Sequence, residues 1–334
     1  MSNLENVDIQ TIVERGVVRL PRKPTATLSY GIAQGHGPLS TTHLLVFLNG
    51  LIMHQRGWDA TIQKLLQTWG AGAGTANYPS LLTYDRYGQG DSEPDPADEQ
   101  SKYGHDMREV VRDLNDLLFK IWYDKQQDGA PSRPHLVFVA NSIGCVIARL
   151  YAETYPSSVT ALLLLDSNIA NSDLVSIFPD PDLQDFDPTS LPAGVSVADL
   201  RDTRAKYKAI FHPSVRNPEN LDRRNVADLL PYDHKPVLKG PDSRGAWITV
   251  VEHDWDTFAE EGLTGSLKTP KGLTNAYMNP AWHRYNEGLV RLTEKERSEG
   301  PVTAKGCGHF IQRDDPGFVA NAIHRLVMKL KQTS

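Results

Sequence analysis

The stretch that decides the fold is HLVFVANSIGCVIARLYAETYP, residues 135–156. It begins as a continuous apolar run typical of a buried strand and continues with the apolar spacing of an amphipathic helix. Ser142 lies at the apex of the reversal between the two. Small residues at Ala140 and Gly144 fit a strand-to-helix turn so sharp that a larger side chain would meet neighbouring backbone. The stretch therefore predicts an exposed serine hydroxyl, followed by a helix whose first N–H group, on Ile143, is free.

Similar apolar runs recur along the chain, and they are continuous rather than alternating. Continuous apolarity indicates strands covered on both faces, as in a parallel sheet with helices on each side. The runs lie at 43–51, 80–93, 161–167 and 246–254, after an opening meander at 16–20 and 26–35. Segments with helical spacing lie at 105–122, 143–155 and 314–330. This alternation predicts an α/β fold with a mostly parallel, doubly wound sheet.

One segment breaks the alternation. Residues 168–241 are rich in proline, aspartate and asparagine, with a helical piece near 197–211. Such an excursion between two strands is too long for a plain connection, so we expect a cap or lid over the strand ends. The predicted organisation is a core domain, 1–167 and 242–334, with a cap insertion at 168–241.

Composition narrows the class of protein. The 334 residues carry 35 Lys and Arg against 41 Asp and Glu, a net charge of -6. This balance argues against nucleic acid and favours a small-molecule partner. Two cysteines, Cys145 and Cys307, are too few for a disulfide framework. No apolar run approaches the roughly 20 residues of a membrane span, and no secretory signal is recognisable. We expect a cytoplasmic protein, of undetermined oligomeric state.

A serine nucleophile needs a base. His309 stands between a strand candidate at 301–305 and the last helix, and Gly306 and Gly308 allow the backbone to bend there. A second oxyanion donor is expected after the strand at 43–51, where the N–H of Leu51 would join that of Ile143. The expected substrate-pocket residues are Asn49, Gly50, Asn141 and Trp282.

Four motifs follow one another in a familiar order: NGL at 49–51, DRYGQGDS at 85–92, NSIG at 141–144 and GCGHF at 306–310. On these motifs the chain resembles the serine hydrolases of the α/β-hydrolase superfamily, from about residue 28 to the C-terminus and least in the cap. It is further similar to fungal members that act in secondary metabolism. The resemblance implies the α/β-hydrolase fold and a Ser-His-acid triad containing Ser142 and His309. It also implies that DRYGQGDS is a structural turn.

The chain departs from the family pattern at three positions. Asn49 stands where histidine is usual, Ala140 replaces the first glycine of the serine turn, and Asn141 replaces a frequent histidine. Each change is sterically tolerable, so activity is still expected, with an altered pocket floor.

The acid of the triad has three candidates. Asp166 ends its strand cleanly at the edge where parallel strands finish, and we favour it. Asp254 and Asp256 lie at the commoner family position, but the usual Gly-x-x-Asp turn is blurred there by His253. A metal site on Glu252 and the neighbouring histidine and aspartates lacks partner ligands elsewhere, so no metal is predicted.

The expected reaction is cofactor-free hydrolysis of a small carboxylic ester, lactone or thioester by Ser142, His309 and Asp166. Two alternatives stay open. The same triad can run C–C bond hydrolysis or a lyase reaction, and the fold can serve as a binding protein without turnover. The sequence does not identify the substrate.

Overall fold

The computed structural model describes residues 9–70, 76–125 and 133–331. Its centre is an eight-stranded sheet in the order β1-β2-β4-β3-β6-β7-β9-β10. The strands are β1 (Glu14–Leu20), β2 (Lys23–Ala33), β3 (His43–Leu48), β4 (Ser80–Tyr84), β6 (His135–Asn141), β7 (Val159–Leu165), β9 (Trp247–His253) and β10 (Ser298–Ala304). β2 runs antiparallel to β1 and to β4, and the other neighbours pair in parallel. The predicted α/β class and mostly parallel sheet are confirmed.

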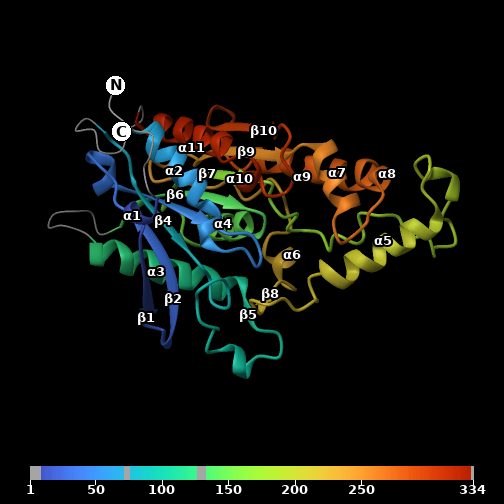
Figure 1. Ribbon diagram of the computed structural model, residues 1–334, viewed down its shortest axis with the longest axis horizontal. Helices are drawn as coiled ribbons and strands as arrows, with labels where there is room; N and C mark the ends of the chain where they lie inside the picture. Colours follow the sequence, from blue (N-terminus) through green and yellow to red (C-terminus); the bar gives the residue numbers. More distant parts are fainter. Residues whose placement is uncertain (1–8, 71–75, 126–132, 332–334) are drawn as a thin grey trace.

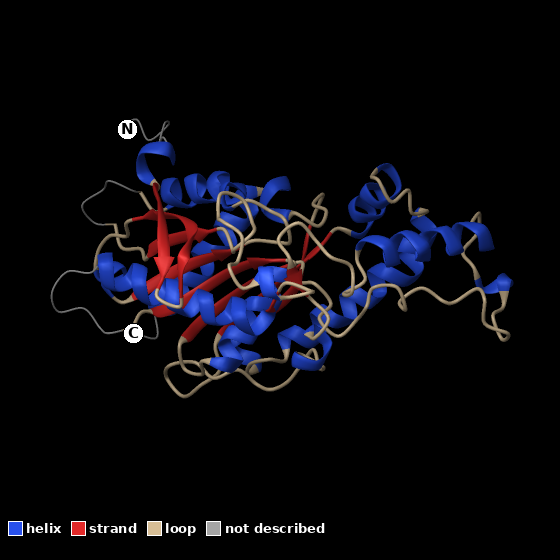
Figure 2. Ribbon diagram, turned by 90° about the horizontal axis from the view of Figure 1, so that it is seen from below, coloured by secondary structure: helices blue, strands red, loops and turns tan. Residues whose placement is uncertain are grey.

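Helices cover both faces of this sheet (Figure 2). They are α1 (Ile9–Ile12), α2 (Asp59–Thr68), α3 (Met107–Lys125), α4 (Ile143–Thr154), α5 (Val197–Ile210), α6 (Val226–Leu229), α7 (Trp255–Thr264), α8 (Lys271–Leu273), α9 (Asn279–Val290), α10 (Ile311–Asp314) and α11 (Pro316–Lys331). Single turns are η1 (Pro38–Thr41), η2 (Gln55–Trp58), η3 (Asp98–Gln100), η4 (Pro188–Ser190), η6 (Lys295–Arg297) and the π-helical η5 (Thr274–Met278). No helix among the described residues has the length and apolarity needed to cross a membrane.

Successive residues of the central strands belong to two different cores. Val137 and Val139 face the core built with α2 and α11, whereas Leu136 and Phe138 face the core built with α3 and α4. Side chains alternate between the two faces of a strand, so a strand buried on both faces must be apolar at every position. The continuous apolar runs of the sequence follow from this double burial.

The cap segment, 168–241, contributes no strand to the eight-stranded sheet. Its helix α5 extends away from the sheet beside α7 and α8 (Figure 1). The ring of Phe178 lies 4.9 Å from that of Tyr207 on α5 and 6.3 Å from that of Tyr277, which follows α8. A short parallel pair, β5 (His105–Asp106) with β8 (Leu221–Asp222), ties the segment to the core. Its role as a lid stays a prediction.

The turn between β6 and α4 leaves no space for a side chain at Gly144. A Cβ atom there would lie 2.4 Å from the Leu48 carbonyl oxygen and 2.9 Å from that of Asn49. These carbonyls end the neighbouring strand β3, so the glycine permits α4 to start directly beside that strand.

We expect Gly144→Ala to lower the free energy of unfolding by about 1–3 kcal/mol, because the extra methyl group overpacks rigid backbone. Gly57→Ala is the control, since a Cβ at Gly57 meets nothing within 4 Å. Urea denaturation of both variants measures the difference. Equal stabilities would contradict the packing argument.

Candidate active site

Four polar side chains gather at the edge of the sheet where the parallel strands end, here called the carboxyl edge. Ser142 follows β6, Asp166 follows β7, His253 ends β9, and His309 lies beyond β10. Parallel strands finish at the same edge, which brings residues from distant parts of the chain together. Ser142, Asp166 and His253 lie on or next to sheet strands, so the scaffold positions them, whereas His309 lies in the loop between β10 and α10.

Ser142 has a strained backbone. Its φ of 56° and ψ of -122° lie outside the regions that non-glycine residues commonly adopt. Neighbouring backbone holds this conformation: the Ser142 N–H donates to the Leu165 carbonyl at 3.1 Å, and its own carbonyl accepts from Asn168 at 3.2 Å. Strain of this kind persists only where the surroundings enforce it, and it concentrates at functional sites.

A short hydrogen bond joins Asp166 and His309. His309 Nδ1 donates to Asp166 Oδ2 at 2.6 Å, and Asp166 is 0% exposed. Asp166 also has a positive φ, 44°, and its N–H donates to the Val251 carbonyl at 2.8 Å. Of the three predicted acids, the structure therefore brings Asp166 to the imidazole.

The other two candidate acids lie at the start of α7. Asp254 accepts hydrogen bonds from the N–H groups of Asp256 and Thr257 at 3.2 Å, which makes it the cap of the helix. Its carboxylate also faces Lys305, at 3.5 Å. Helix capping explains its presence at the end of a strand.

Asn141 links the serine turn to the histidine loop. Its Nδ2 donates to the Leu165 carbonyl at 3.1 Å and to the His309 carbonyl at 3.0 Å, and its Oδ1 accepts from Gln312 at 3.2 Å. The Asn141 side chain therefore connects the two loops.

Among the described residues, no hydrogen bond joins the Ser142 hydroxyl to the His309 ring. Hydrogen bonds between a nucleophile and its base are often long in the absence of substrate.

The loop after β3 is fixed by side chains from the DRYGQGDS turn. Arg86 donates from Nη1 to the Asn49 carbonyl at 2.8 Å and from Nη2 to the Gly50 carbonyl at 3.0 Å, and Gln89 Nε2 also donates to Gly50 at 2.9 Å. In a trans peptide, the carbonyl of one residue and the N–H of the next point in opposite directions. Holding the Gly50 oxygen therefore fixes the direction of the Leu51 N–H.

Glu219 completes this arrangement from the cap segment. It is 1% exposed and forms an ion pair with Arg86, itself 3% exposed, at 2.9 Å. It also accepts from the N–H of Ile52, which has a φ of 55°. A buried ion pair thus connects the cap segment to the loop that carries the predicted oxyanion donor. The family resemblance indicated only a structural turn at Arg86, and nothing in the sequence pointed to Glu219.

Asn49 and Gly50 occupy different environments. Asn49 is buried; its Nδ2 donates to the Tyr84 carbonyl at 2.9 Å, and its Oδ1 accepts from Trp58 Nε1 at 2.8 Å. This side chain therefore stabilises the loop. Gly50 lies against the serine, since a Cβ there would be 3.4 Å from the Ser142 Cβ.

Aromatic rings surround the imidazole of His309. The Trp282 ring lies 5.5 Å away at 67°, the Phe310 ring 5.0 Å away, and the Phe258 ring 6.5 Å away. Trp282 is anchored by a hydrogen bond from Nε1 to the Ser167 carbonyl, 2.8 Å long. These rings give the site an apolar wall.

Asp166 also binds a second histidine. His253 Nδ1 lies 2.8 Å from Asp166 Oδ1, and both residues are buried. Burial by itself would raise the pKa of Asp166, but the charge of His253 and hydrogen bonds from both histidines outweigh it and lower the pKa to about 2. Burial would lower the pKa of His253, yet Asp166 raises it above its ordinary value. The sequence did not predict this contact, and the position of His253 at the end of a strand is the one signal that could have suggested it.

Two groups of potential metal ligands occur among the described residues, and neither is at this site. One is His54, Asp85 and Asp91, and the other is Asp95, Asp98 and His105. In the second group, Asp95 already pairs with the ammonium group of Lys23. The stretch from Glu252 to Asp256 forms neither of them.

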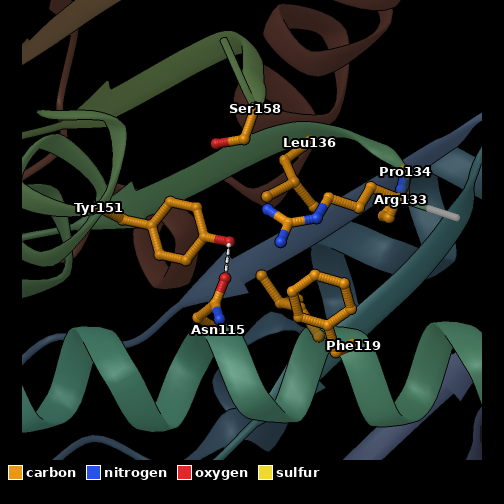
Figure 3. Close-up of a pocket in the computed structure, with 8 residues that line it drawn as sticks. Asn115, Phe119, Arg133, Pro134, Leu136, Tyr151 and Ser158 are labelled. Atoms are coloured by element: carbon orange, nitrogen blue, oxygen red, sulfur yellow. Dashed lines mark hydrogen bonds between the residues drawn. The ribbon is translucent and has the colours of Figure 1, made fainter. Parts of the chain in front are cut away.

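A separate small pocket lies at the amino end of β6 (Figure 3). Asn115, Phe119, Arg133 and Tyr151 are among the residues that line it, and the Tyr151 hydroxyl donates to Asn115 at 3.1 Å. Seven-residue β6 separates this pocket from Ser142 by about 20 Å. The pocket is therefore distinct from the candidate site.

Comparison with known proteins agrees with this architecture. A model of the alpha/beta hydrolase family matches residues 45–322. No curated protein matches the sequence. Among solved structures, an epoxide hydrolase from Vigna radiata has a TM-score of 0.52 at 14% identity, covering 96% of this chain and 99% of that chain. A thermophilic esterase from Thermogutta terrifontis has a TM-score of 0.52 at 14% identity, and the match covers 95% of this chain and 98% of that chain. Likeness at this identity shows the fold, and the predicted α/β-hydrolase fold is confirmed.

Because the Arg86–Glu219 pair is buried, we expect Glu219→Gln to lower the free energy of unfolding by about 3–5 kcal/mol by leaving a buried guanidinium without its counter-charge. Asp182→Asn is the control, because Asp182 pairs with Arg201 on the surface and should not change stability measurably. Chemical denaturation of both variants provides the measurement. A Glu219→Gln protein as stable as the control would show that the buried pair contributes little.

Proposed function

The chain belongs to the alpha/beta hydrolase family, and we propose that it is a serine hydrolase that cleaves a small-molecule carboxylic ester. Lactones and thioesters present the same kind of carbonyl group and fall within the proposal. The observation that carries it is the 2.6 Å hydrogen bond between His309 and the buried Asp166, at the same sheet edge as the strained Ser142. The proposed fungal, secondary-metabolic affinity of the chain stays a prediction.

In the proposed first step, the Ser142 hydroxyl oxygen attacks the substrate carbonyl carbon. His309 accepts the hydroxyl proton at Nε2 and then delivers it to the leaving alcohol, so that an acyl-enzyme remains on the serine. Asp166 holds the Nδ1–H of His309 and stabilises the ring while it is charged. Water, activated by the same histidine, then attacks the acyl carbon, and the acid product leaves with Ser142 restored.

The negative charge on the carbonyl oxygen needs donors that are already in place. The N–H of Ile143 opens α4 next to the serine, and the N–H of Leu51 is directed by the contacts of Arg86 and Gln89 with the Gly50 carbonyl. Neither N–H donates a hydrogen bond to another residue in the described part of the chain. Both are therefore available to the oxyanion.

The apolar wall of Phe258, Trp282 and Phe310 supports a substrate whose acyl or alcohol part is apolar. Asn49 directs its side chain into the loop network instead of toward Ser142, so we assign it a supporting role.

A fluorophosphonate probe tests the proposal directly, because it reacts covalently with activated serines. We expect the wild-type protein to be labelled and Ser142→Ala to remain unlabelled, with matching loss of turnover of p-nitrophenyl esters of graded acyl length. Ser167→Ala serves as a control for a neighbouring serine. A wild-type protein that is neither labelled nor active on any of these esters would overturn the assignment.

The choice of acid generates a second prediction. We expect Asp166→Asn to lower kcat by about 10⁴-fold, because the amide no longer fixes the tautomer of the imidazole. Asp254→Asn should keep kcat near the wild-type value and change stability little, because asparagine caps a helix about as well as aspartate does. Steady-state kinetics and thermal unfolding of the two variants separate these effects. The reverse ranking of kcat would point to Asp254 as the acid.

A further inference from the structure

His253 shares the Asp166 carboxylate with His309, one oxygen each. His309 Nδ1 contacts Oδ2 at 2.6 Å, whereas His253 Nδ1 contacts Oδ1 at 2.8 Å, and the backbone N–H of His253 donates to the same Oδ1 at 3.3 Å. Both His253 and Asp166 are almost completely buried. His309 is partly open to solvent, with 20% of its side chain exposed. The two histidines therefore meet the same acid from different environments.

The second ring nitrogen of His253 faces an acceptor. Nε2 lies 3.1 Å from Asn279 Oδ1 at the start of α9. The orientation of the Asn279 amide is fixed, because its Nδ2 lies 3.2 Å from the backbone carbonyl of Trp255, which can only accept a hydrogen bond. Its Nδ2 also donates to Asn275 at 2.8 Å. The oxygen of Asn279 must therefore face His253, and Nε2 must carry a proton to bind it.

The first ring nitrogen also carries a proton. Nδ1 faces Asp166, whose pKa is lowered, and an ionised carboxylate only accepts. A neutral imidazole has a single N–H and cannot donate from both nitrogens. Two acceptors at the two nitrogens thus require the charged imidazolium form, in agreement with the raised pKa of His253.

In the described part of the chain, Asp166 is the only carboxylate that forms an ion pair with His253. Glu252, the preceding residue, directs its carboxylate to His283 at 2.8 Å and Thr303 at 3.1 Å. The Phe258 ring stacks on the His253 ring at 4.1 Å, and the Trp282 ring makes a T-shaped contact with it at 5.6 Å.

Near His309, two carboxylates accept hydrogen bonds from backbone N–H groups of the histidine loop. Glu261 on α7 accepts from the N–H of His309 at 3.3 Å, and Asp314 on α10 accepts from that of Gly308 at 2.9 Å. Among the described residues, no lysine or arginine forms an ion pair with Asp166. His253 is thus the counter-ion of the acid.

We propose that His253 is a charged positioning residue: as an imidazolium it neutralises Asp166 and holds Oδ1, leaving Oδ2 to orient a neutral His309. The charge state of His253 follows from its contacts, while its effect on catalysis rests on the proposed hydrolase function. A cation beside the acid weakens the attraction between Asp166 and a protonated His309.

Nitrogen-15 NMR of the histidine rings tests the charge state without any need for turnover. At pH 7.5 we expect His253 to give the signal of a ring with both nitrogens protonated, and the absence of that signal from His253→Gln assigns it. Should this variant not fold, Asn279→Leu is used, because it removes the acceptor at Nε2 and the same signal should move toward the neutral form. A neutral His253 signature in the wild-type protein would overturn the proposal even if the protein hydrolyses esters.

The pH dependence of kcat/KM tests the positioning role. In His253→Gln the amide still donates to Asp166 but carries no charge, so we expect the acidic limb of the profile to move up by about one pH unit. Asn279→Leu should move it in the same direction. His283→Gln, on the same helix as Asn279, is the matched control and should leave the limb in place. If His253→Gln lowers stability but leaves the acidic limb unchanged, the histidine is structural only. If no variant and no wild type turns over esters, the proposed function fails while the NMR result still decides the charge of His253.

Discussion

The candidate site depends on one constraint, which is that the carboxylate of Asp166 is charged and completely buried. An ionised carboxylate is expensive to bury unless charges and hydrogen bonds compensate it. Asp166 obtains this compensation from two imidazoles, one on each oxygen, and from a backbone N–H of β9. Because His253 holds Oδ1 from the buried side, the position of Oδ2 and the orientation of the His309 ring are settled before any substrate arrives.

A second buried charge pair organises the opposite side of the site. Arg86 and Glu219 lie 133 positions apart in the chain, and together they bind the carbonyls and N–H groups of the loop after β3. Because the peptide bond is planar, the contacts with the Gly50 carbonyl also fix the direction of the Leu51 N–H. Residues 168–241 therefore supply a buried acid, Glu219, to the loop that carries the proposed oxyanion donor Leu51.

Backbone strain marks the same region. Ile52, Ser142 and Asp166 all have a positive φ, and each lies just beyond the end of a parallel strand. Each of these backbone conformations costs free energy, which the surrounding structure must offset. Such residues concentrate at functional sites. The same fold supports many reactions, so the proposed function rests on the residues of the site rather than on the family.

Local patterns were sufficient to predict the parallel strands, the helices α3, α4, α5 and α11 and the turn at Ser142, because burial on both faces and helical spacing show in consecutive residues. They also favoured Asp166, since it ends an apolar run at the carboxyl edge. Single-sequence patterns did not indicate that His253 would bind this acid, or that Glu219 would bind Arg86. Those contacts join residues 87 and 133 positions apart. Only the packing of one strand beside another, and of the cap segment on the core, determines which of these distant side chains meet.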